Sequence, residues 1–105
     1  MKIRATIDIN VAMGEVSHDG TGCQGYLPEG TRYEDIVRAF GNPQLGASLD
    51  GKIKAEWVGT VNGLVFTIYD YKSRIEPEKN TDWHVGGKHN FVSELVNLYL
   101  AAKIK

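Results

Sequence analysis

The fold is decided by residues 52–72, which read KIKAEWVGTVNGLVFTIYDYK. Two runs rich in β-branched and aromatic residues, Lys52–Val61 and Leu64–Lys72, flank the dipeptide Asn62-Gly63. Asn-Gly suits the two central positions of a tight hairpin turn, where both residues need a positive φ. The sequence therefore predicts two antiparallel strands joined by a two-residue turn.

A turn of two residues also fixes which side chains lie opposite each other. Val61 then pairs with Leu64, and Trp57 lies opposite Ile68. Because side chains alternate between faces along a strand, Trp57 and Ile68 are predicted on the buried face. The other face carries mostly charged and aromatic side chains, namely Lys54, Glu56, Val58, Thr67, Tyr69 and Tyr71. Such a face suits a binding or subunit surface, and the alternative is a solvated sheet face that carries tyrosines.

Two segments lie before the first predicted helix, which itself precedes the hairpin. Lys2–Val11 alternates polar and apolar residues, which predicts a strand. Gly20–Gly30 contains four glycines and a proline, which predicts a loop. A loop of this length could fold over a ligand, with Tyr26 as a contact, or it is an ordinary surface loop.

A helix is predicted after Thr31, because Thr31 and Glu34 have the spacing of a capping box. Gly41 ends this helix, and Pro43 prevents its continuation. The predicted buried stripe consists of Tyr33, Ile36, Val37 and Phe40, which follow at helical spacing.

The segment after the hairpin predicts a charged loop over Ser73–Thr81, a short strand over Asp82–Val85 and a final helix over Phe91–Ala102 with Asn90 as its cap. The order of elements indicates a single α+β domain over residues 1–105. It has a mainly antiparallel sheet with the Asn-Gly hairpin and two helices packed on one face. The apolar stripe of the final helix is wider than one small sheet needs, so it favours either core packing or contact with a second copy.

Composition limits the partners that we expect. The net charge is −1, so attraction to nucleic acid polymers or acidic membranes is not expected. Cys23 is the only cysteine, which excludes an internal disulfide and fits a reducing cytoplasm. The N-terminal residues do not resemble a signal peptide, and no segment has the length of apolar sequence that spans a bilayer.

The residue pattern gives little support to catalysis. Cys23 has no base near it in sequence, and no nucleophile-elbow motif is present. Asp82, His84 and His89 lie within eight residues, yet no further histidine or cysteine pair completes a metal site. We therefore expect a protein that is not an enzyme, without a metal or another cofactor.

Binding of a small phosphorylated ligand is the chemistry on which most features converge. Gly86, Gly87 and Lys88 precede the final helix, whose N-terminus offers free backbone N–H groups and a partial positive charge to a phosphate. Arg74 adds a second cation. The predicted stacking partners for a base are Trp83, Tyr69 and Tyr71, with His84 beside them. The alternative is that the glycine pair is a structural turn between strand and helix.

Four fragments resemble small accessory proteins of bacteriophages. They are Leu27-Pro28-Glu29-Gly30-Thr31, Ala55-Glu56-Trp57, Thr67-Ile68-Tyr69-Asp70-Tyr71-Lys72 and Trp83-His84-Val85-Gly86-Gly87. By size and type of site, the chain is similar to phage anti-defence proteins that sequester nucleotide immune signals, the anti-Thoeris and anti-CBASS sponges.

This resemblance implies a protein in the cytoplasm of the infected host that binds a cyclic nucleotide signal without cleaving it. A homo-oligomer is expected, because a chain of 105 residues supplies few walls for a ligand. The alternative is an inhibitor that binds a host defence complex directly, as anti-CRISPR proteins do.

Overall fold

A computed structural model describes residues 9–14, 16–17, 20–46, 48 and 51–104, and these residues form an α+β fold. The sequence predicted this class correctly. In chain order the elements are β1 (Val11–Met13), β2 (Gly22–Tyr26), α1 (Tyr33–Phe40), β3 (Glu56–Val61), β4 (Leu64–Tyr69), the 3₁₀ helix η1 (Pro77–Lys79), β5 (His84–Gly87) and α2 (Val92–Ile104).

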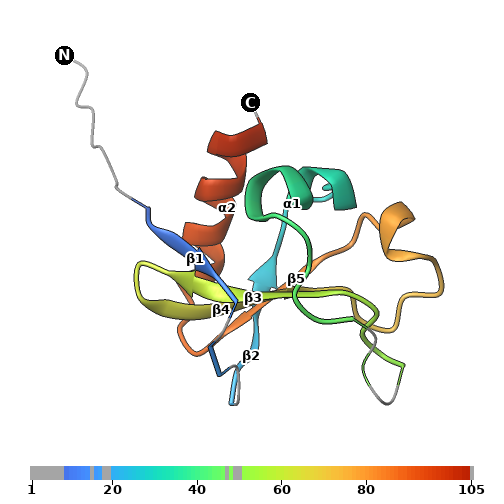
Figure 1. Ribbon diagram of the computed structural model, residues 1–105, viewed down its shortest axis with the longest axis horizontal. Coiled ribbons are helices and arrows are strands. Elements are labelled where there is room, and N and C mark those ends of the chain that lie inside the picture. The colour runs from blue at the N-terminus through green and yellow to red at the C-terminus, as the bar shows by residue number, and fades with distance from the viewer. Residues whose placement is uncertain (1–8, 15, 18–19, 47, 49–50, 105) are drawn as a thin grey trace.

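The strands form one antiparallel sheet of five strands in the order β1-β3-β4-β5-β2. β3 and β4 have the expected register, with Val61 opposite Leu64 and Trp57 opposite Ile68. Asn62 and Gly63 connect these strands with φ angles of 50° and 79°. Both α-helices lie on the same side of the sheet (Figure 1). We call the opposite side the outward face.

The core lies between this sheet and the two helices. Trp57 and Ile68 are fully buried, as the hairpin register predicts. The other large side chains with almost no exposed surface include Trp83, Phe66, Ile36, Val85, Val92, Val96 and Leu100. In the part of the chain that the structure describes, no helix has both the length and the apolar character needed to cross a membrane.

The glycine-rich segment Gly20–Gly30 is not only a loop, and this prediction was wrong. Residues Gly22–Tyr26 form the edge strand β2, which pairs with β5. Glycines are rare in strands, so local sequence does not favour this structure. Gly25 has a packing reason, because a Cβ there would lie 2.7 Å from Ser93 Oγ of α2. Glycine thus lets the helix approach the strand.

The helix also covers the free edge of β2. Ser93 Oγ donates to the backbone oxygen of Gln24 at 3.5 Å, and Asn97 Nδ2 donates to that of Tyr26 at 3.0 Å. These side chains occupy carbonyl groups that an unpaired edge strand would otherwise present to another chain.

The predicted N-terminal strand is observed only in part. Lys2–Asp8 lie outside the described residues. Of the rest of the predicted range Lys2–Val11, only Val11 belongs to a strand, and β1 continues from there to Met13. Val11 lies opposite Val61, and Ile9 packs against the core on the same side.

The N-cap of the first helix lies one residue later than predicted. Arg32, not Thr31, is the N-cap, and its backbone N–H donates to Asp35 Oδ2 at 3.0 Å. This bond lowers the pKa of Asp35 below its ordinary value. Thr31 Oγ1 instead donates to the backbone oxygen of Pro28 at 2.6 Å. The predicted stripe is correct, with Ile36 and Phe40 buried.

Candidate functional site

The structure separates the predicted ligand-binding residues into three environments. Trp83 is only 1% exposed, and its Nε1 donates to the backbone oxygen of Asn80 at 3.1 Å. The prediction that Trp83 stacks on a ligand is therefore wrong, because its ring belongs to the core. The next residue, His84, begins β5 and points to the opposite face, as consecutive residues of extended backbone do.

The glycine pair also differs from its prediction. Gly86 and Gly87 lie within β5, between β4 and β2, and they pair with both strands. Their backbone groups serve the sheet, and four residues separate them from the start of α2 at Val92. They do not form a phosphate-binding helix N-terminus. Lys88 is exposed in the turn that follows.

Close packing explains why these two positions are glycine. A Cβ at Gly86 would collide with Thr67 Oγ1 and lie 3.3 Å from the Tyr69 ring. At Gly87 it would lie 3.2 Å from both Val65 O and Val92 Cγ1. The glycines are therefore required by neighbours on β4 and α2, which local sequence does not reveal.

The structure instead gathers three tyrosines around His84 on the outward face. The Tyr69 ring stacks on the imidazole with 5.3 Å between centroids and 22° between planes. Tyr26 approaches it at 4.9 Å and Tyr71 at 5.9 Å, both at steeper angles. We call Tyr26, Tyr69, Tyr71 and His84 the tyrosine–histidine cluster. Of these residues, Tyr69, Tyr71 and His84 were predicted as site residues.

The pairing of three strands produces this cluster. Tyr69 of β4 lies opposite His84 of β5, and His84 lies opposite Tyr26 of β2. Residues in register across neighbouring strands point to the same face, so the three rings form a row. Glu56 of β3 continues this row opposite Tyr69.

A β-bulge in β2 adds Cys23 to the same face. Cys23 pairs with Gly86 and Gly25 pairs with Val85, so Gln24 is an extra residue without a partner on β5. Residues 23 and 26 would face opposite sides of a regular strand, but the extra residue brings both to one side. Cys23 Sγ consequently lies 3.8 Å from His84 Nδ1. Sequence reasoning missed this pair because the two residues are far apart in the chain.

The cluster also changes the acidity of Tyr69. Burial, the neighbouring Cys23 side chain and the Glu56 carboxylate together raise the pKa of Tyr69 to about 12. The phenol therefore keeps its proton at neutral pH and remains a hydrogen-bond donor.

An open cavity of about 210 Å³ adjoins the cluster. Tyr69 and Tyr71 form part of its wall, and the small residues Thr67, Gly86 and Gly22 leave the space open. Thr21, Ile53 and Glu56 complete the lining. A second hollow of about 440 Å³ is lined by Tyr26, Leu27, Glu29, Thr81 and Asp82.

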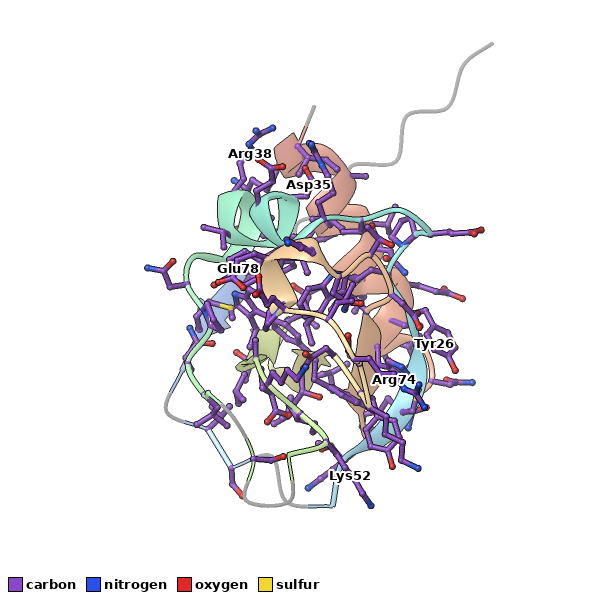
Figure 2. The ribbon with its side chains drawn as sticks, turned by 90° about the vertical axis from the view of Figure 1, so that its right-hand side faces the viewer. Tyr26, Asp35, Arg38, Lys52, Arg74 and Glu78 are labelled. Atoms are coloured by element: carbon purple, nitrogen blue, oxygen red, sulfur yellow. The ribbon has the colours of Figure 1, made fainter. Side chains whose placement is uncertain are left out.

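Basic side chains lie near the cluster. Lys72 Nζ lies 5.3 Å from the centre of the Tyr71 ring, and Lys54 Nζ donates to the backbone oxygen of Ile75 at 3.1 Å. Arg74 is exposed and forms no ion pair with another described residue. Figure 2 shows Arg74 and Tyr26 on the same flank of the molecule. Unlike the glycine pair, Arg74 thus remains available to an anionic ligand.

The site combines flat aromatic rings with nearby positive charge. Among the described residues, no three His, Cys, Asp or Glu side chains come close enough together to hold a metal ion. Comparison with known proteins adds no relative: no protein-family model, no curated protein and no solved structure matches this chain.

Proposed function

We propose that this protein binds a small nucleotide on its outward face and holds it without cleaving it. The observation that carries this proposal is the tyrosine–histidine cluster, in which three tyrosine rings surround His84 beside a cavity of about 210 Å³. Stacking of a base on an aromatic side chain contributes about 1–3 kcal/mol and needs no catalytic group.

The size of the cavity limits how much of the ligand it encloses. Pockets for whole small molecules measure about 300–1,000 Å³, whereas this cavity measures about 210 Å³. It therefore suits one ring, and the rest of the ligand would lie along the surface. Arg74 and Lys72 are the cations that would contact its phosphate groups.

A nucleotide with two bases would then need two copies of the protein, one for each base. A symmetric dimer satisfies this requirement, and it is the assembly that we propose. Leu98 of α2, which is 50% exposed, is apolar surface that such an assembly could use. A cytoplasmic phage protein that sequesters a cyclic nucleotide immune signal is the biological role that fits this ligand and the resemblance of its sequence fragments.

A second function is favoured by the rim of the same face. Tyr26, Tyr71 and Ile75 are 57%, 42% and 46% exposed, although all three are large and apolar. Exposed aromatic side chains are typical of protein-binding surfaces. An inhibitor that docks on a host defence protein would use this rim without needing the cavity.

Thermal denaturation with a panel of cyclic dinucleotides, cyclic trinucleotides and cyclic ADP-ribose isomers separates these functions. At a ligand concentration of 100 times Kd, binding stabilises the fold by about 2.7 kcal/mol. This should raise Tm by roughly 10 °C or more for a domain of this size. A panel without any shift would contradict the nucleotide proposal and favour the protein-binding function.

Titration calorimetry of variants then locates the site. Tyr71→Ala should weaken nucleotide binding by about 1–3 kcal/mol, because it removes a stacking ring. Arg74→Ala should weaken it by about 1–2 kcal/mol, and Lys88→Ala should have a smaller effect. Phe91→Ala is the matched control, since it removes an aromatic ring of similar exposure, 46%, outside the tyrosine–histidine cluster. Loss of binding with Lys88→Ala alone would place the ligand at the turn after β5 instead.

A further inference from the structure

The thiol of Cys23 lies among groups that can promote its chemistry. Its Sγ is exposed and lies 3.8 Å from His84 Nδ1, an atom that can accept a proton in one imidazole tautomer. The thiol also donates to the backbone oxygen of Gly25 at 3.5 Å, and the Tyr69 side chain of β4 is a further neighbour. A histidine beside a cysteine can take the thiol proton as the sulfur attacks.

Space for an incoming molecule is also present. Gly22, which precedes Cys23, and Gly86, which pairs with it, both line the open cavity beside the cluster. A reagent that enters this cavity would therefore reach the region around Sγ without displacing a bulky side chain. The access and the proton acceptor are independent observations.

We propose that Cys23 is a site of thiol–disulfide exchange with low-molecular-weight disulfides, and that His84 is its base. His84 Nδ1 accepts the thiol proton, and the Cys23 thiolate attacks one sulfur of the disulfide. The bond between the two sulfurs of the reagent breaks as the bond to Cys23 Sγ forms. The leaving thiolate takes the proton from the imidazolium, so one disulfide is consumed and one is made.

The product is a stable mixed disulfide. Cys23 is the only cysteine of the chain, so no second thiol within the molecule can displace the attached group. The attached group would lie on the face that carries Tyr26 and Tyr69. Its effect on a bound nucleotide rests on the proposed function, whereas the exchange itself does not.

The rate of exchange tests the proposal with the whole chain and the uncharged probe dithiodipyridine at pH 7. The folded protein should react at least about tenfold faster than the same chain unfolded in urea, with glutathione measured in both solvents as the reference. Mass spectrometry should find one adduct, which Cys23→Ser abolishes. This comparison uses no nucleotide, so its outcome is independent of the nucleotide proposal.

Variants of His84 test the role of the base. His84→Ala should lose most of the rate advantage, and added imidazole should restore part of it. His89→Ala is the matched control, because it removes an exposed imidazole that lies outside the tyrosine–histidine cluster. A folded His84→Ala protein that reacts at the wild-type rate would overturn the proposal. So would a folded wild-type rate no higher than that of the unfolded chain, and this second comparison decides alone if His84→Ala fails to fold.

Discussion

Trp57 and Trp83 meet edge to face in the core, with 5.4 Å between ring centroids and 78° between ring planes. Each indole N–H has a backbone acceptor: Trp57 Nε1 donates to Gly41 O at 2.8 Å, and Trp83 Nε1 donates to Asn80 O at 3.1 Å. The acceptors follow α1 and η1 directly, so the two rings join these helices to the sheet. Edge-to-face pairs of this kind add to the stability that burial of the rings supplies.

Replacement of Trp57 should therefore be costly. Trp57→Ala removes a fully buried ring and leaves a cavity, so the free energy of unfolding should fall by about 3–5 kcal/mol in urea denaturation. Arg38→Ala, at an exposed position of α1, should change it by less than about 0.5 kcal/mol. Equal stability of Trp57→Ala and wild type would mean that the two faces of the hairpin are reversed.

Asp70 should be a second critical residue, because it is fully buried at the end of β4. Its Oδ1 accepts hydrogen bonds from the backbone N–H groups of Lys54 at 2.8 Å and Ala55 at 3.1 Å. Asp70→Ala removes the acceptor, and each buried N–H left without a partner costs about 1–3 kcal/mol. Asp70→Asn keeps an acceptor oxygen and should lose less. An Asn variant as unstable as the Ala variant would show that the negative charge, not the hydrogen bonds, stabilises this end.

Gly25→Ala tests the contact between β2 and α2. The new Cβ would lie 2.7 Å from Ser93 Oγ, so the helix or the strand must move, at a cost of about 1–3 kcal/mol. Gly22→Ala is the matched control in the same strand, since a Cβ there has no atom within 4 Å. Denaturant midpoints of the two variants should therefore differ clearly, and coinciding midpoints would show that β2 does not pack against the helix.

Tyr69 should make stability depend on pH in the alkaline range. Its pKa is about 12 in the folded protein and 10.0 as the ordinary value, so the unfolded chain loses this proton first. The contribution of Tyr69 to stability is complete below pH 10 and is lost as pH rises toward 12. Ultraviolet titration should show a late phenolate that Tyr69→Phe removes and Tyr71→Phe retains. A late phenolate that persists in Tyr69→Phe would assign the high pKa to another tyrosine.

The parts of the fold that sequence predicts are those with local causes. Asn62-Gly63 sets its own turn geometry, and the spacing of Ile36 and Phe40 indicates the buried side of α1 without knowledge of the sheet. β2 has no such signal, because its glycines oppose strand formation. It is a strand because β5 pairs with it and α2 packs against it.

The candidate site was predictable to a similar degree. Tyr69 and Tyr71 follow from the hairpin register alone. Trp83 was assigned to the wrong face, although its alternation with His84 in one strand means that both cannot face a ligand. The partnership of Cys23 with His84 depends on the bulge at Gln24, and neither the bulge nor the pairing of β2 with β5 has a local sequence signal.

The unpaired residue Gln24 determines how β2 responds to a change in its length. Substitution at an exposed position of this strand changes one side chain and leaves its neighbours where they are. Deletion of Gln24 would instead make the strand regular, with Cys23 and Tyr26 two positions apart and therefore still on one face. Deletion of Gly25 would also make it regular, but it would place the Gln24 side chain against Ser93 of α2, where only a glycine fits. Tolerance of a deletion in this strand should therefore depend on which of the two residues is lost, although both deletions shorten the chain equally.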